Sequence, residues 1–306
     1  MPEDNSLNQR PIVHMGFHKT GTSWFQRQFY PSVENLDYMH HYQVKKIFLD
    51  PRGLEETGSE EKDIAMSGKI LCHEELSGNI QAGGLNSFAT MEIARRIKDK
   101  VENPKIVLFI RNQKCMIASA YSQYIKNGGN YSATRYLFHK EFQKTHREAL
   151  FSFQHFDYDL KLKYYESLFG KENIHLYLYE DFSADGEGFI KQYKKDLNIV
   201  CSVMPKARVN VAYGRGILQL SRLINVFSRE AMIYKYYLLH LPGLHSLARR
   251  VLPKLNKIKL FNKKATPEAL LGDDNIKFID EYYKASNRRL SERYPLAFEK
   301  HGYIKP

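Results

Sequence analysis

A lysine and a group of hydroxylated residues stand together near the start of the chain, in the run Lys19-Thr20-Gly21-Thr22-Ser23-Trp24. The apolar run 11–17 before them predicts a buried strand. Gly21 allows the backbone to turn sharply and to approach a ligand closely. The three hydroxyl groups lie where a helix should begin, and the free N–H groups of a helix start attract anions. The run is therefore predicted to hold a phosphate-like group.

The glycine spacing of this run is close to that of a nucleotide-binding loop. Gly16 and Gly21 match the pattern G-x-x-x-x-G, but Thr22 stands where a nucleotide triphosphatase carries its lysine. The lysine is instead at position 19, two residues before the second glycine. A kinase or another nucleotide-binding enzyme stays open as an alternative, and so does a turn that binds no ligand.

Two further polar groups follow predicted strands. Arg111 comes directly after the apolar run 105–110, and Ser119 lies eight residues later in a predicted helix. A guanidinium group presents a planar fork of donors that suits phosphate oxygens. His73-Glu74-Glu75 follows the apolar run 69–73 and supplies candidate bases. Because ligands bind at the carboxyl ends of strands in parallel sheets, we expect all these groups to converge.

The elements that must position these residues alternate along the chain. Strands are predicted over 11–17, 69–73, 105–110 and 174–179, and helices over 22–30, 88–101, 115–125 and 157–168. This order indicates βαβ units, hence an α/β fold with a central parallel sheet flanked by helices. The acidic stretch 51–68 is predicted to be a surface loop. The 306 residues, 1–306, are expected to form a single domain.

Composition narrows the class of protein. The three cysteines lie far apart and offer neither a disulfide framework nor metal-ligand spacing, which indicates a reducing compartment. The polar first ten residues lack a signal-peptide core, and no apolar run has the length of a membrane span, so we expect a cytoplasmic protein. The histidine spacing predicts no zinc site. The net charge of +12 favours an anionic ligand, although nucleic acid or a membrane surface would also suit it.

Two segments have functions that the sequence leaves open. Residues 231–265 contain no acidic side chain, and 231–272 is predicted to be a basic helical insertion or lid. Within it, an apolar stripe opposite the basic face comprises Leu244, Leu247, Ala248, Val251, Leu252 and Leu255. The stretch 231–264 can lie on the inner face of an anionic membrane, bind a polyanionic glycan, or pack on its own domain. The aromatic residues of 131–158 can stack on sugars or belong to the core.

The run 19–24 resembles the 5′-phosphosulfate loop of sulfotransferases that use 3′-phosphoadenosine 5′-phosphosulfate (PAPS). Arg111 and Ser119 resemble the 3′-phosphate motif of the same family. Weaker matches occur at 156–182 and at 208–216, where the Arg-Lys-Gly run of the steroid and phenol enzymes is missing. The resemblance covers about 11–225 and 283–303, and it is closest to bacterial, carbohydrate-type enzymes. It implies a P-loop-type three-layer fold and PAPS as co-substrate without a metal. It also implies transfer to a hydroxyl or amine of a carbohydrate or glycolipid acceptor.

The resemblance also implies roles for individual residues. Lys19 would stabilise the leaving phosphate, Thr20 to Ser23 would hold it, and Trp24 would lie near the adenine. Arg111 and Ser119 would bind the 3′-phosphate, with Arg215 and Gly216 near it. Glu74 is favoured as the base, His73 is second and Glu75 third. A P-loop kinase and a non-catalytic basic module remain as alternatives; no nucleic-acid partner is expected.

Overall fold

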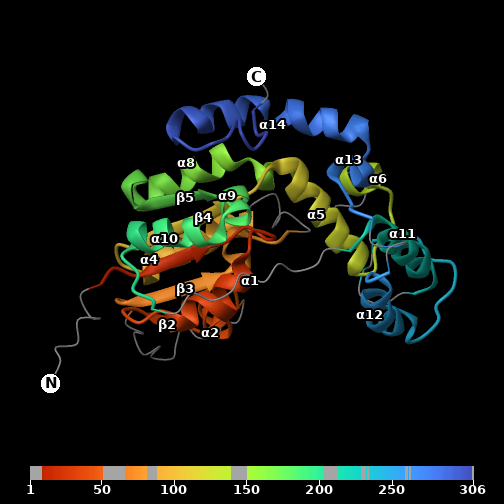
Figure 1. The fold of residues 1–306 in the computed structure, drawn as a ribbon, viewed down its shortest axis with the longest axis horizontal. Helices are drawn as coiled ribbons and strands as arrows, with labels where there is room; N and C mark the ends of the chain where they lie inside the picture. The colour runs from red at the N-terminus through yellow and green to blue at the C-terminus, as the bar shows by residue number, and fades with distance from the viewer. Residues whose placement is uncertain are drawn as a thin grey trace.

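The computed structural model describes residues 9–50, 66–80, 88–138, 150–202, 213–228, 232, 234–258, 261 and 263–304. Within these residues a single sheet of five parallel strands has the order β2-β3-β1-β4-β5 (Figure 1). The strands are β1 (Ile12–Met15), β2 (Asp37–Met39), β3 (Lys69–His73), β4 (Lys105–Ile110) and β5 (Ile174–Leu178). The predicted α/β fold with a parallel central sheet is confirmed. Strand β2 is not apparent in the sequence, because three residues at a sheet edge leave almost no periodic pattern.

The register brings the carboxyl ends of the central strands together. Met15 pairs with His73, so the turns that follow β1 and β3 begin side by side. On the other side of β1, His14 pairs with Val107 of β4, which continues to Ile110. The same edge of the sheet is therefore followed by the run 16–21, the turn after β3 and Arg111.

Helices cover both faces of the sheet (Figure 1). Those that precede β5 in the chain are α1 (Thr22–Trp24), α2 (His41–Phe48), α4 (Phe88–Lys100), α5 (Gln113–Lys126), α6 (Ala133–Leu137) and α8 (Tyr158–Phe169). Those that follow β5 are α9 (Tyr179–Ala184), α10 (Gly186–Leu197), α11 (Arg215–Ile224), α12 (Leu244–Leu255), α13 (Pro267–Leu271) and α14 (Asp273–Arg293). After α1 the chain continues as a π-helical turn, Phe25–Phe29, and a 3-10 turn, Tyr30–Ser32. The predicted helices over 88–101, 115–125 and 157–168 are confirmed.

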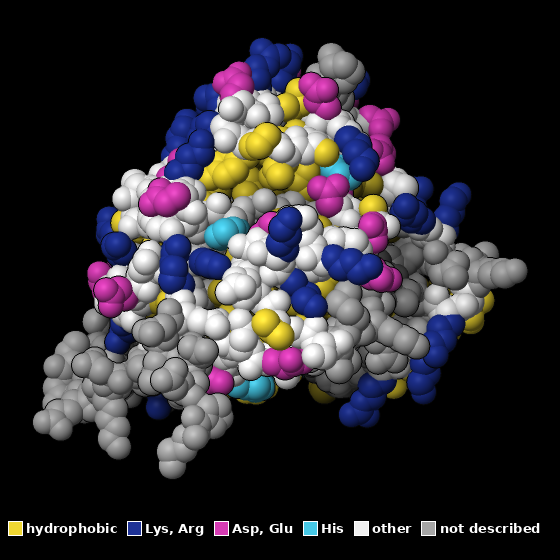
Figure 2. Space-filling model, turned by 60° about the vertical axis from the view of Figure 1, so that its left-hand side comes forward, with side chains coloured by type: hydrophobic (Ala, Val, Ile, Leu, Met, Phe, Trp, Pro, Cys, Tyr) yellow, Lys and Arg dark blue, Asp and Glu magenta, His cyan; other side chains and the backbone are white. Residues whose placement is uncertain are grey.

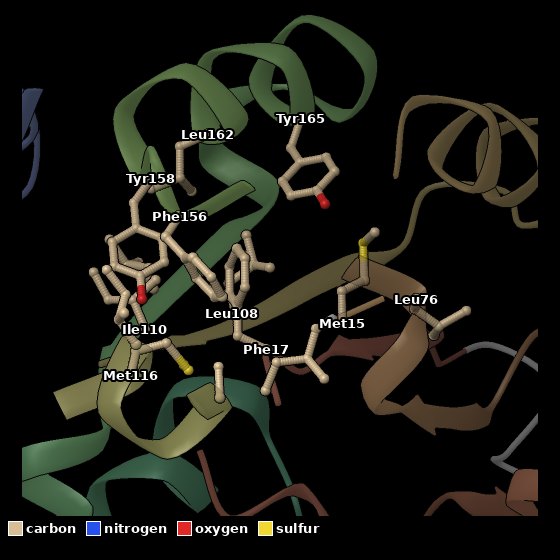
Figure 3. Packing of buried hydrophobic residues seen from close by; sticks show 14 of the residues in the cluster. Met15, Phe17, Leu76, Leu108, Ile110, Met116, Phe156, Tyr158, Leu162 and Tyr165 are labelled. Atoms are coloured by element: carbon tan, nitrogen blue, oxygen red, sulfur yellow. The ribbon is translucent and has the colours of Figure 1, made fainter. Parts of the chain in front are cut away.

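Each face of the sheet has its own apolar core. On one face, side chains of β1 and β4 point toward those of α8, as Figure 3 shows for Met15, Leu108, Tyr158 and Leu162. On the other face, Phe25, Phe29 and Trp24 pack with α9 and α10. Complete burial of one such side chain stabilises the fold by about 1.5–3 kcal/mol. The central strands β1, β3 and β4 are thus buried on both faces, as their continuous apolar runs predicted.

The C-terminal basic segment is helical only in part. Residues 234–243 form no helix, whereas α12 and α13 do. The α12 stripe divides: Ala248 and Leu252 are buried with Ile217 of α11, but Leu247 and Val251 are exposed. The stripe was expected to lie as a whole opposite the basic face. The helix contacts α11 through one edge of the stripe, at Ala248 and Leu252, so the other edge is left in solvent.

Two other expectations concern the same and neighbouring segments. Lys235 is buried and does not belong to an exposed basic face. Aromatic residues of 131–158 that are buried in the core are Tyr131, Tyr136, Phe151, Phe156 and Tyr158. Residues 51–65 of the predicted surface loop lie outside the described residues, and Met66 beyond them is buried.

Candidate functional site

The turn between β1 and α1 has an unusual backbone. Gly21 has φ 89° and ψ 2°, the left-handed region that favours glycine, and Lys19 has φ 64°. A left-handed conformation at a non-glycine residue costs about 1–3 kcal/mol and is often found at functional sites. The Thr20 hydroxyl donates a hydrogen bond to the Phe17 carbonyl and holds the turn closed. The turn thus keeps a conformation that its lysine would not adopt alone.

Thr22 directs a hydroxyl group into this turn. Its Oγ1 is buried and has no hydrogen-bond partner among the described residues. A Cβ atom at Gly16 would lie 2.2 Å from this oxygen, so only glycine fits at that position. A buried hydroxyl without a partner costs free energy unless a ligand or water satisfies it. This observation fits an anionic group held by the turn.

The Arg111 guanidinium reaches the backbone of Lys19, and its charge acts on the Lys19 ammonium group. The Arg111 guanidinium donates to the Lys19 carbonyl at 3.2 Å and lies 4.9 Å from the centre of the Tyr179 ring. Lys19 Nζ donates to Gln123 Oε1 of α5 at 2.7 Å. Although the Lys19 side chain is exposed, partial desolvation lowers its pKa; Arg111 lowers it further, whereas Glu74 raises it. Two cations predicted from separate motifs therefore share one site.

The backbone at Arg111 is clamped by distant parts of the chain. Tyr158 of α8 donates its hydroxyl to the Arg111 carbonyl at 2.8 Å. The next amide, of Asn112, donates to Glu180 Oε1 at 2.9 Å, and Tyr303 donates to the other oxygen of Glu180 at 3.0 Å. These contacts fix the backbone that carries the arginine side chain. The sequence predicted no role for Glu180 or Tyr303. Their partners are more than 45 residues away along the chain, beyond any local pattern.

The predicted bases lie on the other side of the turn. Glu74 begins a 3-10 turn (Glu74–Ser77), and Gln26 donates to its Oε2 at 3.3 Å. His73 is buried, which lowers the pKa of its imidazole, and its Nδ1 accepts from the Glu75 amide at 3.1 Å. Ser77 Oγ donates to the Gly16 carbonyl at 3.1 Å and joins this turn to the first one. The arrangement places the Glu74 carboxylate within electrostatic reach of Lys19, and the His73 imidazole within reach of that carboxylate.

The structure adds two residues that the sequence analysis did not assign to the site. His18 lies within electrostatic reach of Glu74, and burial lowers its pKa to about 4. Lys126 lies near Lys19, and burial followed by that lysine's charge lowers its pKa to about 8. Its Nζ is 4.1 Å from the centre of the Tyr213 ring. The sequence could have indicated Lys126, because it lies two helical turns after Ser119 and therefore on the same side of the helix.

The remaining predicted residues lie around this centre. Ser119 is half-buried, and helical spacing puts it on the face of α5 that carries Gln123. Trp24 is buried with its ring against Phe29 and Phe182, so its contacts are those of a core residue. These contacts do not support the predicted position of Trp24 beside an adenine.

Arg215 is exposed at the start of α11, and its amide donates to the Lys263 carbonyl at 2.9 Å. A Cβ atom at Gly216 would lie 3.3 Å from the Phe261 backbone, so this glycine allows close packing within the C-terminal segment. Tyr213 links the segment to Lys126 and thereby to the site.

Comparison with known proteins leaves the family open. No protein-family model matches the sequence, and no curated protein matches it. Among solved structures, one match is a sulfotransferase from Alicyclobacillus acidocaldarius. It is 19% identical, covers 66% of this chain and 86% of that chain, and has a TM-score of 0.48. Similarity at this level assigns neither activity nor ligand.

The described part of the chain shows no group of three or more potential metal ligands. Among the same residues, no helix has the length and apolar character needed to cross a bilayer.

Proposed function

We propose that the chain is a PAPS-dependent sulfotransferase that acts on a hydroxyl or amine of a carbohydrate or glycolipid. The observation that supports this most is the hydrogen bond from Arg111 to the Lys19 carbonyl. It joins a 5′-phosphate-type turn to a second cation at the same sheet edge. A ligand with phosphate groups at both ends of an adenosine suits two such sites.

The residues of the turn would bind and polarise the 5′ end of PAPS. PAPS supplies a sulfuryl group that an acceptor oxygen or nitrogen takes in line with the departing phosphate. Lys19 would stabilise the negative charge that grows on that phosphate, and Thr22 would donate its unpartnered hydroxyl to it. Thr20 keeps the turn closed, while Ser23 lies half-buried at the helix start. Positioning and charge therefore supply most of the catalysis.

Arg111 and Ser119 would hold the 3′-phosphate. The clamp through Tyr158 and Glu180 fixes the backbone from which the guanidinium extends. Charge-assisted hydrogen bonds contribute about 1.5–3 kcal/mol each. Loss of the 3′-phosphate from the ligand should then weaken binding by at least about tenfold.

Glu74 would take the proton of the acceptor. Gln26 orients the Glu74 carboxylate, and the carboxylate is close enough to Lys19 to raise the pKa of that lysine. His73 is the alternative, because burial keeps its imidazole neutral. Glu75 is the third candidate; its amide is already bonded to His73.

Calorimetric titration with three nucleotides tests the proposal. 3′-Phosphoadenosine 5′-phosphate (PAP) should bind at least about tenfold more tightly than AMP, which lacks the 3′-phosphate. ATP is the third ligand, because the Gly16 and Gly21 spacing also suits a kinase. Preference for ATP would indicate a phosphotransferase, and binding of none of the three would indicate a non-catalytic module.

A further inference from the structure

The segment 236–241 presents large apolar side chains to solvent. The exposed fraction is 82% for Leu238, 57% for Leu239 and 43% for Leu241. Tyr236 and Tyr237 beside them are about half exposed. Single exposed leucines are common, but a contiguous apolar patch usually marks an interaction surface.

The backbone of this segment is anchored, so the exposure is built into the fold. The Leu238 and Leu241 amides donate to the carbonyls of Val226 and Phe227, both at 3.0 Å. Asn130 brackets Tyr236, donating to its carbonyl at 2.6 Å and accepting from its amide at 2.9 Å. These bonds fix the chain along the end of α11. The leucines between them remain outside the core.

Helix α12, which begins three residues after this segment, adds two exposed apolar residues, Leu247 and Val251. Leu247, Arg250, Val251 and Lys254 have the spacing i, i+3, i+4 and i+7, and all four are exposed. They therefore share one outward face of the helix. The opposite face is occupied, because Ala248 and Leu252 pack on α11.

The charge around these apolar residues has one sign. The sequence has no acidic residue from 231 to 267. Exposed basic residues in the described part of this stretch are Arg249, Arg250, Lys254, Lys257, Lys263 and Lys264. On the face drawn in Figure 2, by contrast, basic and acidic side chains are interspersed.

We propose that residues 236–258 dock on an anionic phospholipid bilayer. Exposed leucines can enter the boundary between headgroups and acyl chains, while the basic side chains contact the headgroups. Each Lys or Arg near an anionic surface contributes to binding. The aliphatic residues favour lipid over a polyanionic glycan, which offers charge but no apolar phase.

Helix α11 connects this surface to the proposed active site. Tyr213 joins the start of α11 to Lys126, and Figure 1 shows α11 and α12 beyond the end of α5. Docking would hold the site close to lipid-linked acceptors. The inference itself is independent of the proposed function, because lipid binding is measured without any nucleotide.

Sedimentation with vesicles tests the docking surface. The full chain should sediment with phosphatidylglycerol-rich vesicles and remain in solution with pure phosphatidylcholine. Leu238→Asp with Leu239→Asp should weaken binding at least about tenfold, since two exposed leucines leave the lipid. Arg250→Glu with Lys254→Glu should weaken it about 30-fold, because two basic contacts on the outward face of α12 are lost.

Leu160→Asp is the matched control, since Leu160 on α8 is also 57% exposed and lies outside this surface. It should bind vesicles as the unmodified chain does. Light scattering in parallel measures the oligomeric state. No vesicle binding by the unmodified chain would overturn the proposal, and so would a dimer that Leu239→Asp dissociates. Binding to heparin that the leucine variants retain, with no binding to vesicles, would also overturn it.

Discussion

Replacing Gly21 with alanine tests whether the turn after β1 is a ligand-binding structure. At φ 89° and ψ 2°, an alanine in this left-handed conformation costs about 1–2 kcal/mol. Its Cβ atom would also lie 3.1 Å from Cε1 of Phe182, which is buried against Trp24 and cannot easily move. Crowding of this kind typically adds about 1–3 kcal/mol. We therefore expect Gly21→Ala to lower the free energy of unfolding by about 2–5 kcal/mol.

Gly243→Ala is the matched control. Gly243 has φ 76° and ψ −8°, and it also precedes a helix, α12, but a Cβ atom there meets nothing within 4 Å. This variant should show only the conformational cost, about 1–2 kcal/mol. Urea unfolding measures both variants.

Measuring PAP binding shows whether Gly21→Ala affects only the stability of the fold or also the binding of the ligand. Relief of the strain at Gly21 would displace the N–H groups of residues 21–23 and the Lys19 ammonium, so PAP should bind at least about tenfold more weakly. The Gly243→Ala variant should bind PAP as the unmodified chain does. If Gly21→Ala folds and binds PAP with unchanged affinity, the turn is not the phosphate site.

Three further predictions concern single side chains. Glu74→Gln should lower kcat by about 10²–10⁴-fold with PAP affinity unchanged, whereas Glu75→Gln should have little effect; steady-state kinetics measure both. Arg111→Lys should reduce the preference for PAP over AMP at least about fivefold, because an ammonium loses the fork of donors and the contact over Tyr179; calorimetry measures this. Burial lowers the pKa of Lys161 from 10.5 to about 7, so the unfolded state binds more protons between these values and stability should rise with pH there. Lys161→Met should reduce that rise, as urea unfolding at pH 7 and pH 9 measures.

Each of these three has a clear contrary result. Full activity of Glu74→Gln would remove the carboxylate from the mechanism and leave His73 as the base. An unchanged PAP-to-AMP ratio in Arg111→Lys would place the 3′-phosphate elsewhere. Equal pH dependence in Lys161→Met and the unmodified chain would mean that titration of Lys161 does not control stability in this range.

The local pattern of residues was sufficient to predict most of the elements. The apolar runs at 69–73 and 105–110 coincide with β3 and β4, since strands buried on both faces must be continuously apolar. The glycine and hydroxyl spacing of 16–23 located the turn, because backbone conformation there depends on adjacent residues. From the order of elements, the shared sheet edge of Lys19 and Arg111 also followed.

Tertiary structure alone decided which side chains meet. Glu180 and Tyr303 clamp Arg111 from positions far along the chain, and no periodicity connects them. Leu247 and Leu252 are both leucines of one amphipathic helix, yet the first is exposed and the second is buried, because only one side of α12 meets α11. The sequence determines the period with which side chains repeat, whereas contacts between elements determine which of them face a neighbour and which face solvent.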